Sequence, residues 1–136
     1  MEFKFTYTRL YVESYETCLK FYRDILGLEE TFASEIDTYV ELTDGATKLT
    51  LLNRNKITEY FGSDTPVSFG HKNDAIALSF QVKDVDEAFT YLKQQGVEIV
   101  SEPWDFVDWG VKLALVRDPE GNLIELNQLA QMVGAE

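Results

Sequence analysis

Several residue types are scarce in this sequence of 136 residues, and each scarcity excludes a class of chemistry. A single cysteine, Cys18, allows no disulfide within the chain and suits a reducing cytosol, so we expect a cytoplasmic protein. A single histidine, His71, leaves too few ligands for a zinc site of histidine and cysteine within one chain. Any Ser-His-Asp or Cys-His arrangement would need His71, whose polar, turn-like surroundings favour a solvated loop residue, although its role stays open.

Long apolar runs and basic residues are also scarce. No run approaches the roughly 20 apolar residues of a membrane-spanning helix, and the N-terminal residues lack the pattern of a secretory signal, so we expect no membrane partner. Lys and Arg number 12 against 24 acids, which gives a net charge of −12. Such a surface repels phosphate backbones, so nucleic-acid binding is not expected. It attracts cationic ligands, although solubility is the favoured explanation of such an acid excess.

The sequence contains an internal repeat, in which residues 12–22 align with residues 82–92. Each copy starts with a residue that favours a helix N-cap, Ser14 or Asp84, and continues with apolar residues at helical spacing. A glycine ends each pattern, as a left-handed C-cap prefers. The repeat therefore predicts one helix in each half of the chain.

Strand-like segments surround each expected helix, with turn residues such as Asp44-Gly45 between the last two segments of the first copy. The expected strands are residues 3–12, 29–33, 38–43 and 47–53 in the first copy, and residues 75–82, 98–103, 111–117 and 123–127 in the second. The pattern predicts an α+β chain with two βαβββ modules in tandem. We expect module one at about residues 1–56, a linker at about 57–73, module two at about 74–128, and then a short C-terminal tail.

Two segments of the chain resemble the vicinal-oxygen-chelate (VOC) superfamily, which includes glyoxalase I, extradiol dioxygenases, fosfomycin-resistance enzymes and bleomycin-resistance proteins. Phe21–Leu28 is similar to the helix end F-Y-x-x-x-L-G of that family, and Arg117–Leu126 is similar to its closing hairpin R-D-P-D-G-N-x-I-E. The resemblance covers nearly the whole chain. It implies a single VOC domain over residues 1–136, a concave, half-barrel-like mixed sheet with helices outside, and a homodimer.

Metal-dependent members of the superfamily take ligands from the first and last strand of each module, usually His, Glu, His or Gln, and Glu. The resemblance puts these positions at Tyr7, Leu49, Ala77 and Glu125, where Leu49 comes from aligning the turn glycines of the two copies. Leucine and alanine cannot bind a metal ion, and a neutral tyrosine is a poor ligand for the divalent metals involved. We therefore expect a member without a metal site or other cofactor.

Strand alternation around these positions predicts a small-molecule groove with aromatic and polar walls. Glu125 is either a hydrogen-bonded relic of the ligand set or a group that binds ligand, and it is a weak candidate for catalysis. Trp109 belongs to an aromatic loop that stacks on a flat ligand or packs against the neighbouring module. The expected groove residues are Tyr7, Arg9, Leu49, Leu51, Ala77, Ser79, Trp109 and Glu125.

Two classes of function follow from the resemblance. The first is a metal-free binding protein, similar to bleomycin-resistance proteins, that holds a cationic, aromatic molecule in an acidic, aromatic groove. The alternative is a glyoxalase-type lyase or isomerase that acts on a small electrophile, with Glu125 as general base and Tyr7 or Arg9 as stabiliser. The chemistry of the second class needs a metal to stabilise an enediolate, which favours the first. A plainer version of the first class binds an endogenous metabolite.

Overall fold

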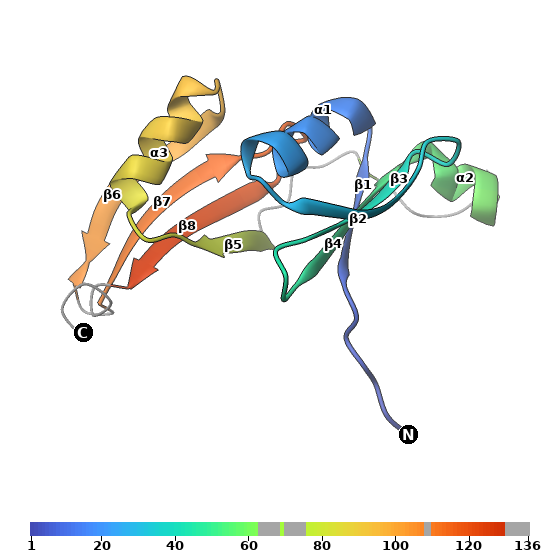
Figure 1. Cartoon of the computed structure of the whole chain (residues 1–136), viewed down its shortest axis with the longest axis horizontal. Coiled ribbons are helices and arrows are strands. Elements are labelled where there is room, and N and C mark those ends of the chain that lie inside the picture. Colours follow the sequence, from blue (N-terminus) through green and yellow to red (C-terminus); the bar gives the residue numbers. More distant parts are fainter. Residues whose placement is uncertain (63–68, 70–75, 108–109, 130–136) are drawn as a thin grey trace. The chain divides into compact units, whose positions relative to one another are not determined.

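The computed structural model describes residues 1–62, 69, 76–107 and 110–129. Two of the residues singled out above, His71 and Trp109, lie outside this part of the chain. The chain divides into two compact units, Met1–Phe69 and Gly70–Glu136, each with its own sheet (Figure 1). Among the described residues, no helix is long and apolar enough to cross a membrane.

Unit one contains a four-stranded mixed sheet in the order β1-β4-β3-β2. Strand β1 runs parallel to β4, while β4, β3 and β2 pair antiparallel. The elements in chain order are β1 (Thr8–Val12), α1 (Tyr15–Leu19), η1 (Lys20–Ile25), β2 (Glu29–Ser34), β3 (Tyr39–Thr43), β4 (Lys48–Asn53) and α2 (Asn55–Phe61).

Unit two repeats this plan with the order β5-β8-β7-β6, in which β5 is parallel to β8. Its elements are β5 (Ala77–Gln81), α3 (Val85–Gln94), β6 (Glu98–Phe106), β7 (Val111–Arg117) and β8 (Leu123–Leu129). Each unit is thus a βαβββ module, which confirms the predicted α+β fold.

The helix of each unit covers one face of its own sheet and forms the core there. In unit one, the strand residues Val12, Leu42 and Leu51 are fully buried. They lie on the face of the sheet that the buried helix residues Tyr15 and Cys18 cover. In unit two, Ile124, Val116 and Ala114 are fully buried on the side of α3. Because side chains alternate along a strand, the neighbours of these core residues lie on the opposite face, away from the helix.

Helix α3 begins with two side-chain caps that reach its first amides. Asp84 Oδ1 accepts a hydrogen bond from the Glu87 amide at 3.1 Å, as predicted. Gln128 Oε1, from the last strand, accepts one from the Val85 amide at 2.8 Å. Ser14 makes no corresponding side-chain bond at the start of α1. Only the second of the two expected side-chain caps is therefore present.

Several elements differ from the sequence-based expectation, among them β6 and β8, which continue to Phe106 and Leu129 beyond the expected ends at residues 103 and 127. The first strand begins at Thr8 rather than Phe3, and Phe3 is 90% exposed. The first helix changes to a π-helix at Lys20, and within it Phe21 and Tyr22 are both buried, with their ring centroids 4.9 Å apart in an edge-to-face arrangement. The expected linker contains a short helix, α2, anchored by the buried Ile57.

Candidate functional site

The register of the last hairpin in each unit decides which residues are equivalent. In unit one Thr43 pairs with Lys48, whereas in unit two Arg117 pairs with Leu123, so the second turn is one residue longer. Across the parallel pair, Arg9 lies opposite Thr50 and Ser79 lies opposite Glu125. The counterpart of Glu125 in unit one is therefore Thr50, not Leu49.

Two residues expected in the groove, Leu49 and Leu51, lie in the core instead. They flank Thr50 on β4, so they point to the helix-covered face, where Leu51 has no exposed surface. Aligning the turn glycines caused this error of one residue because the two turns differ in length. The apolar-polar-apolar run 49–51 matches the run 124–126, and this signal would have identified Thr50.

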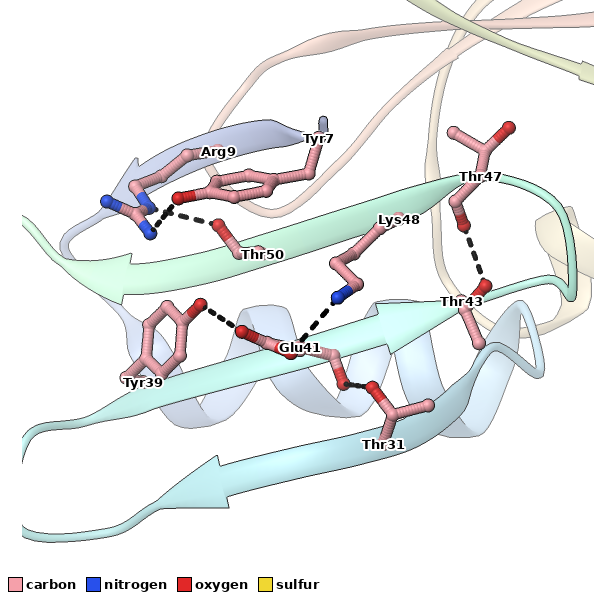
Figure 2. A network of polar contacts seen from close by, with 9 residues as sticks. All are labelled: Tyr7, Arg9, Thr31, Tyr39, Glu41, Thr43, Thr47, Lys48 and Thr50. Carbon is pink, nitrogen blue, oxygen red and sulfur yellow. Dashed lines mark hydrogen bonds and ion pairs between the residues drawn. The ribbon is translucent and has the colours of Figure 1, made fainter. Parts of the chain in front are cut away.

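Arg9, on the edge strand β1, contacts several polar and aromatic side chains on the open face of the unit-one sheet (Figure 2). Its Nε donates a hydrogen bond to Thr50 Oγ1 at 3.1 Å, and its Nη2 donates one to Tyr7 OH at 2.8 Å. The guanidinium carbon lies 5.0 Å from the Tyr7 ring centroid and 5.4 Å from that of Tyr39. Arg9 thus bridges the two positions, Tyr7 and Thr50, at which unit one would supply metal ligands.

The charge of Arg9 is stabilised where it lies. Partial burial lowers the pKa of Arg9, but hydrogen bonds with the Tyr11 and Tyr39 hydroxyls outweigh this, so the pKa is raised overall. Arginine already remains protonated at every physiological pH. Tyr7 and Thr50 therefore face a permanent positive charge.

A carboxylate, Glu41, lies on β3 on the same face and was not identified from the sequence. Tyr39 OH donates to Glu41 Oε2 at 2.7 Å, and Lys48 Nζ lies 3.4 Å from Oε1 (Figure 2). The Tyr39 hydrogen bond and the Lys48 charge lower the pKa of Glu41, although partial desolvation opposes them. Burial and the bond to Glu41 raise the pKa of Tyr39 to about 12, so Tyr39 stays a hydrogen-bond donor at neutral pH.

On the equivalent face of unit two, Ser79 takes the position of Arg9, and the carboxylate of Glu125 takes the position of the Thr50 hydroxyl. Ser79 Oγ donates to Glu125 Oε1 at 2.7 Å, and Asn127 Nδ2 donates to Ser79 Oγ at 2.9 Å. Ala77, at the remaining expected ligand position, has only a methyl group. The structure thus brings Ser79 and Glu125 together as expected and adds Asn127 to them.

The four corrected positions, Tyr7, Thr50, Ala77 and Glu125, do not fit a divalent metal ion. They supply one carboxylate and two neutral hydroxyls, and both hydroxyls are hydrogen-bonded to the Arg9 cation. A metal ion at Tyr7 and Thr50 would lie beside that cation and gain only weak ligands. Across the described ranges, no group of three or more His, Cys, Asp or Glu residues is placed to hold a metal.

Similar proteins are known both from sequence and from solved structures. The chain is 32% identical over 121 residues to "Uncharacterized protein YraH" of Bacillus subtilis (strain 168), covering 89% of this chain and 94% of that protein. The structure of hypothetical protein SA1046 from S. aureus matches with a TM-score of 0.76 at 20% identity, covering 94% of this chain and 95% of the other. Lactoylglutathione lyase from Agrobacterium tumefaciens matches with a TM-score of 0.69 at 22% identity, covering 92% of each chain.

These two structural matches show a shared fold and carry no information on activity. The family model of the Glyoxalase/Bleomycin resistance protein/Dioxygenase superfamily matches residues 4–126. This match spans both βαβββ units and agrees with the resemblance of the segments 21–28 and 117–126. The chain belongs to the glyoxalase/bleomycin resistance protein/dioxygenase superfamily.

Proposed function

We propose that this protein binds a small molecule without a metal ion, on the sheet faces that its helices leave open. The observation that carries the proposal is the Arg9 guanidinium, which is hydrogen-bonded to both unit-one ligand positions, Tyr7 and Thr50. A family member that relied on a metal would need anionic or imidazole ligands there. In the proposed function the polar groups of this face contact an organic ligand directly.

Glu125 is the proposed anchor for a cationic or hydrogen-bond-donating group of the ligand. Its Oε1 accepts from Ser79, while no described side chain donates to Oε2. Ser79 is itself held by Asn127, so the carboxylate is oriented before ligand arrives. The net charge of −12 would steer a cationic molecule toward the protein. Trp109 remains a predicted stacking residue, outside the described part of the chain.

A glyoxalase-type lyase or isomerase is the alternative, and it depends on Glu125 acting as a general base. Its half-buried carboxylate and its bond to Ser79 are compatible with proton transfer. That chemistry needs a metal to stabilise the enediolate, and the four ligand positions described above do not fit one. Direct binding without turnover is therefore the better-supported function.

The test is a thermal-shift screen of the chelator-treated protein. The wild-type melting temperature should rise with a planar cationic compound such as bleomycin and should not change with Ni²⁺, Zn²⁺ or Mn²⁺, because only a ligand of the native state stabilises it. Glu125→Gln should weaken drug binding about tenfold, the effect of losing one charge-assisted hydrogen bond. Glu87→Gln, which removes an exposed carboxylate from α3, should bind like wild type.

Two results would count against the proposal. Tight, stoichiometric metal binding that Glu125→Gln abolishes would restore the metal-dependent interpretation. Turnover of methylglyoxal and glutathione by folded protein, above the rate in buffer, would establish the lyase alternative. In either case the role of Arg9 at Tyr7 and Thr50 would have to be reconsidered.

A further inference from the structure

We infer that Arg9 and Tyr7 form a receptor for an oxyanion group of the ligand, such as a carboxylate or a phosphate, at the place where relatives of this fold hold a metal. The inference rests on the proposed function, since it names a chemical group that the bound molecule would carry. Arg9 and Tyr7 both belong to unit one, so the receptor is described within that unit alone.

The hydrogen-bond directions leave two donors for such a group. Tyr7 OH accepts its bond from Arg9 Nη2, so the phenolic proton remains to be donated elsewhere. Arg9 uses Nε and Nη2 on Thr50 and Tyr7, and the Tyr11 and Tyr39 hydroxyls also accept from it, so these four hydroxyls engage up to four of the five guanidinium N–H groups and leave one. Tyr7 is 36% exposed, so a solute reaches this pair from the open face. A guanidinium N–H beside a phenol O–H matches two oxygens of one oxyanion.

The Arg9 side chain is held in place before a ligand arrives. Thr50, which has no exposed surface, fixes Nε, and the rings of Tyr7 and Tyr39 lie 5.0 and 5.4 Å from the guanidinium carbon. An arginine oriented in this way loses little side-chain entropy when it binds. The flanking rings also favour an aromatic or planar body attached to the oxyanion.

The nearest carboxylate does not cancel this positive charge. On strands β1, β4 and β3, the charged side chains of the open face are Arg9, Lys48 and Glu41, and Glu41 is engaged by Lys48 and Tyr39. The edge strand β2 adds Glu29 at its far end, opposite Thr43. Because the whole chain carries −12, long-range attraction would not bring an anion here, so binding must come from these local donors.

The experiment is an NMR titration of the full chain, recording amide shifts with benzoate, phenyl phosphate and neutral benzamide as probes. Benzoate or phenyl phosphate should shift amides of β1 and β4, and the stronger of the two identifies the oxyanion as carboxylate or phosphate. Benzamide should cause no such shifts. Tyr7→Phe should weaken binding about fivefold and Arg9→Gln on the order of thirtyfold, from the loss of one and of several charge-assisted contacts. Arg23→Gln, which removes an exposed arginine paired with Asp24 and Glu30, should leave it unchanged.

Equal shifts with benzamide, or wild-type affinity in Arg9→Gln, would overturn the inference. If Arg9→Gln does not fold, the affinities of Arg9→Lys and Tyr7→Phe for the oxyanion probes test the inference instead. Wild-type affinity in both variants would also refute the oxyanion receptor. The proposed function fails separately. If the drug binds in a manner that depends on Glu125 but no oxyanion binds, only the oxyanion receptor is refuted. If neither the drug nor an oxyanion binds, both the receptor and the proposed function are refuted.

Discussion

Replacing Thr50 by valine tests whether Arg9 is bound to the metal-ligand position of unit one. Valine keeps the shape of this fully buried side chain but removes the oxygen that accepts the 3.1 Å hydrogen bond from Arg9 Nε. Hydrogen bonds to charged groups contribute about 1.5–3 kcal/mol, and the partial exposure of Arg9 places this one near the lower limit. We expect Thr50→Val to lower the free energy of unfolding by about 1.5 kcal/mol.

The matching change at the other partner, Arg9→Gln, removes more than this one bond. It also removes the 2.8 Å bond to Tyr7 OH and the cation–π contacts with the rings of Tyr7 and Tyr39. Each of the two cation–π contacts contributes about 0.5–1 kcal/mol at a partly exposed site. The expected loss is about 3 kcal/mol. Both single variants lose the same Arg9–Thr50 bond, so that loss is counted twice when their two losses of unfolding free energy are added. The double variant should therefore be about 1 kcal/mol more stable than this sum predicts.

Urea denaturation followed by far-UV circular dichroism measures these free energies, because that signal reports both units. Tryptophan fluorescence serves as the control, since Trp104 and Trp109 both belong to unit two and follow its unfolding. A coupling energy below about 0.5 kcal/mol would refute the reasoning. Arg9 would then not be bound to Thr50, and the argument against a metal at this position would lose its main support.

Three further predictions concern other parts of the structure. The pKa of Glu41 is lowered by its hydrogen bond from Tyr39, so it contributes stability above its ordinary value of about 4.3 and loses that contribution as the pH falls through its lower folded value. In urea titrations at a series of pH values below about 4.3, the free energy of unfolding of Glu41→Gln should therefore fall less steeply with decreasing pH than that of the wild type. Equal slopes of the free energy against pH would contradict the assignment. Asp118, only 3% exposed, accepts three hydrogen bonds at 2.8–2.9 Å within its turn, so Asp118→Ala should cost about 2–4 kcal/mol in the same assay, and a loss below about 1 kcal/mol would contradict this role. The expected homodimer should be visible by light scattering at micromolar concentration, and replacing the exposed aromatics Phe3 and Phe5 by serine should weaken it; a monomeric wild type would refute the prediction.

The fold was predictable because its signals act within a few residues of the chain. Gly27 and Gly96 take positive φ angles of 83° and 81°, which few other residues tolerate, and they follow the helices as the sequence indicates. Asp84 caps the amide three residues later. The π-helix over Lys20–Ile25 was not predictable in this way, because the apolar spacing of this segment also fits an ordinary α-helix.

The candidate site was predictable only in part, because its chemistry depends on pairs of residues from different strands. Ser79 and Glu125 were found because both follow from strand alternation and the closing-hairpin motif. Thr50 was missed through one residue of turn length, and Glu41 was missed because its role depends on Tyr39 beside it. No local pattern shows that a side chain on β1 reaches across to β4.

An arginine at the position of a metal changes how the protein depends on its surroundings. A metal site is filled only as far as free metal, competing chelators and pH allow. The guanidinium of Arg9 is covalently attached and charged in every copy of the chain, so a local positive charge beside Tyr7 and Thr50 is present at full occupancy from the moment the sheet forms. Metal starvation, chelation or exchange for a wrong ion cannot remove it.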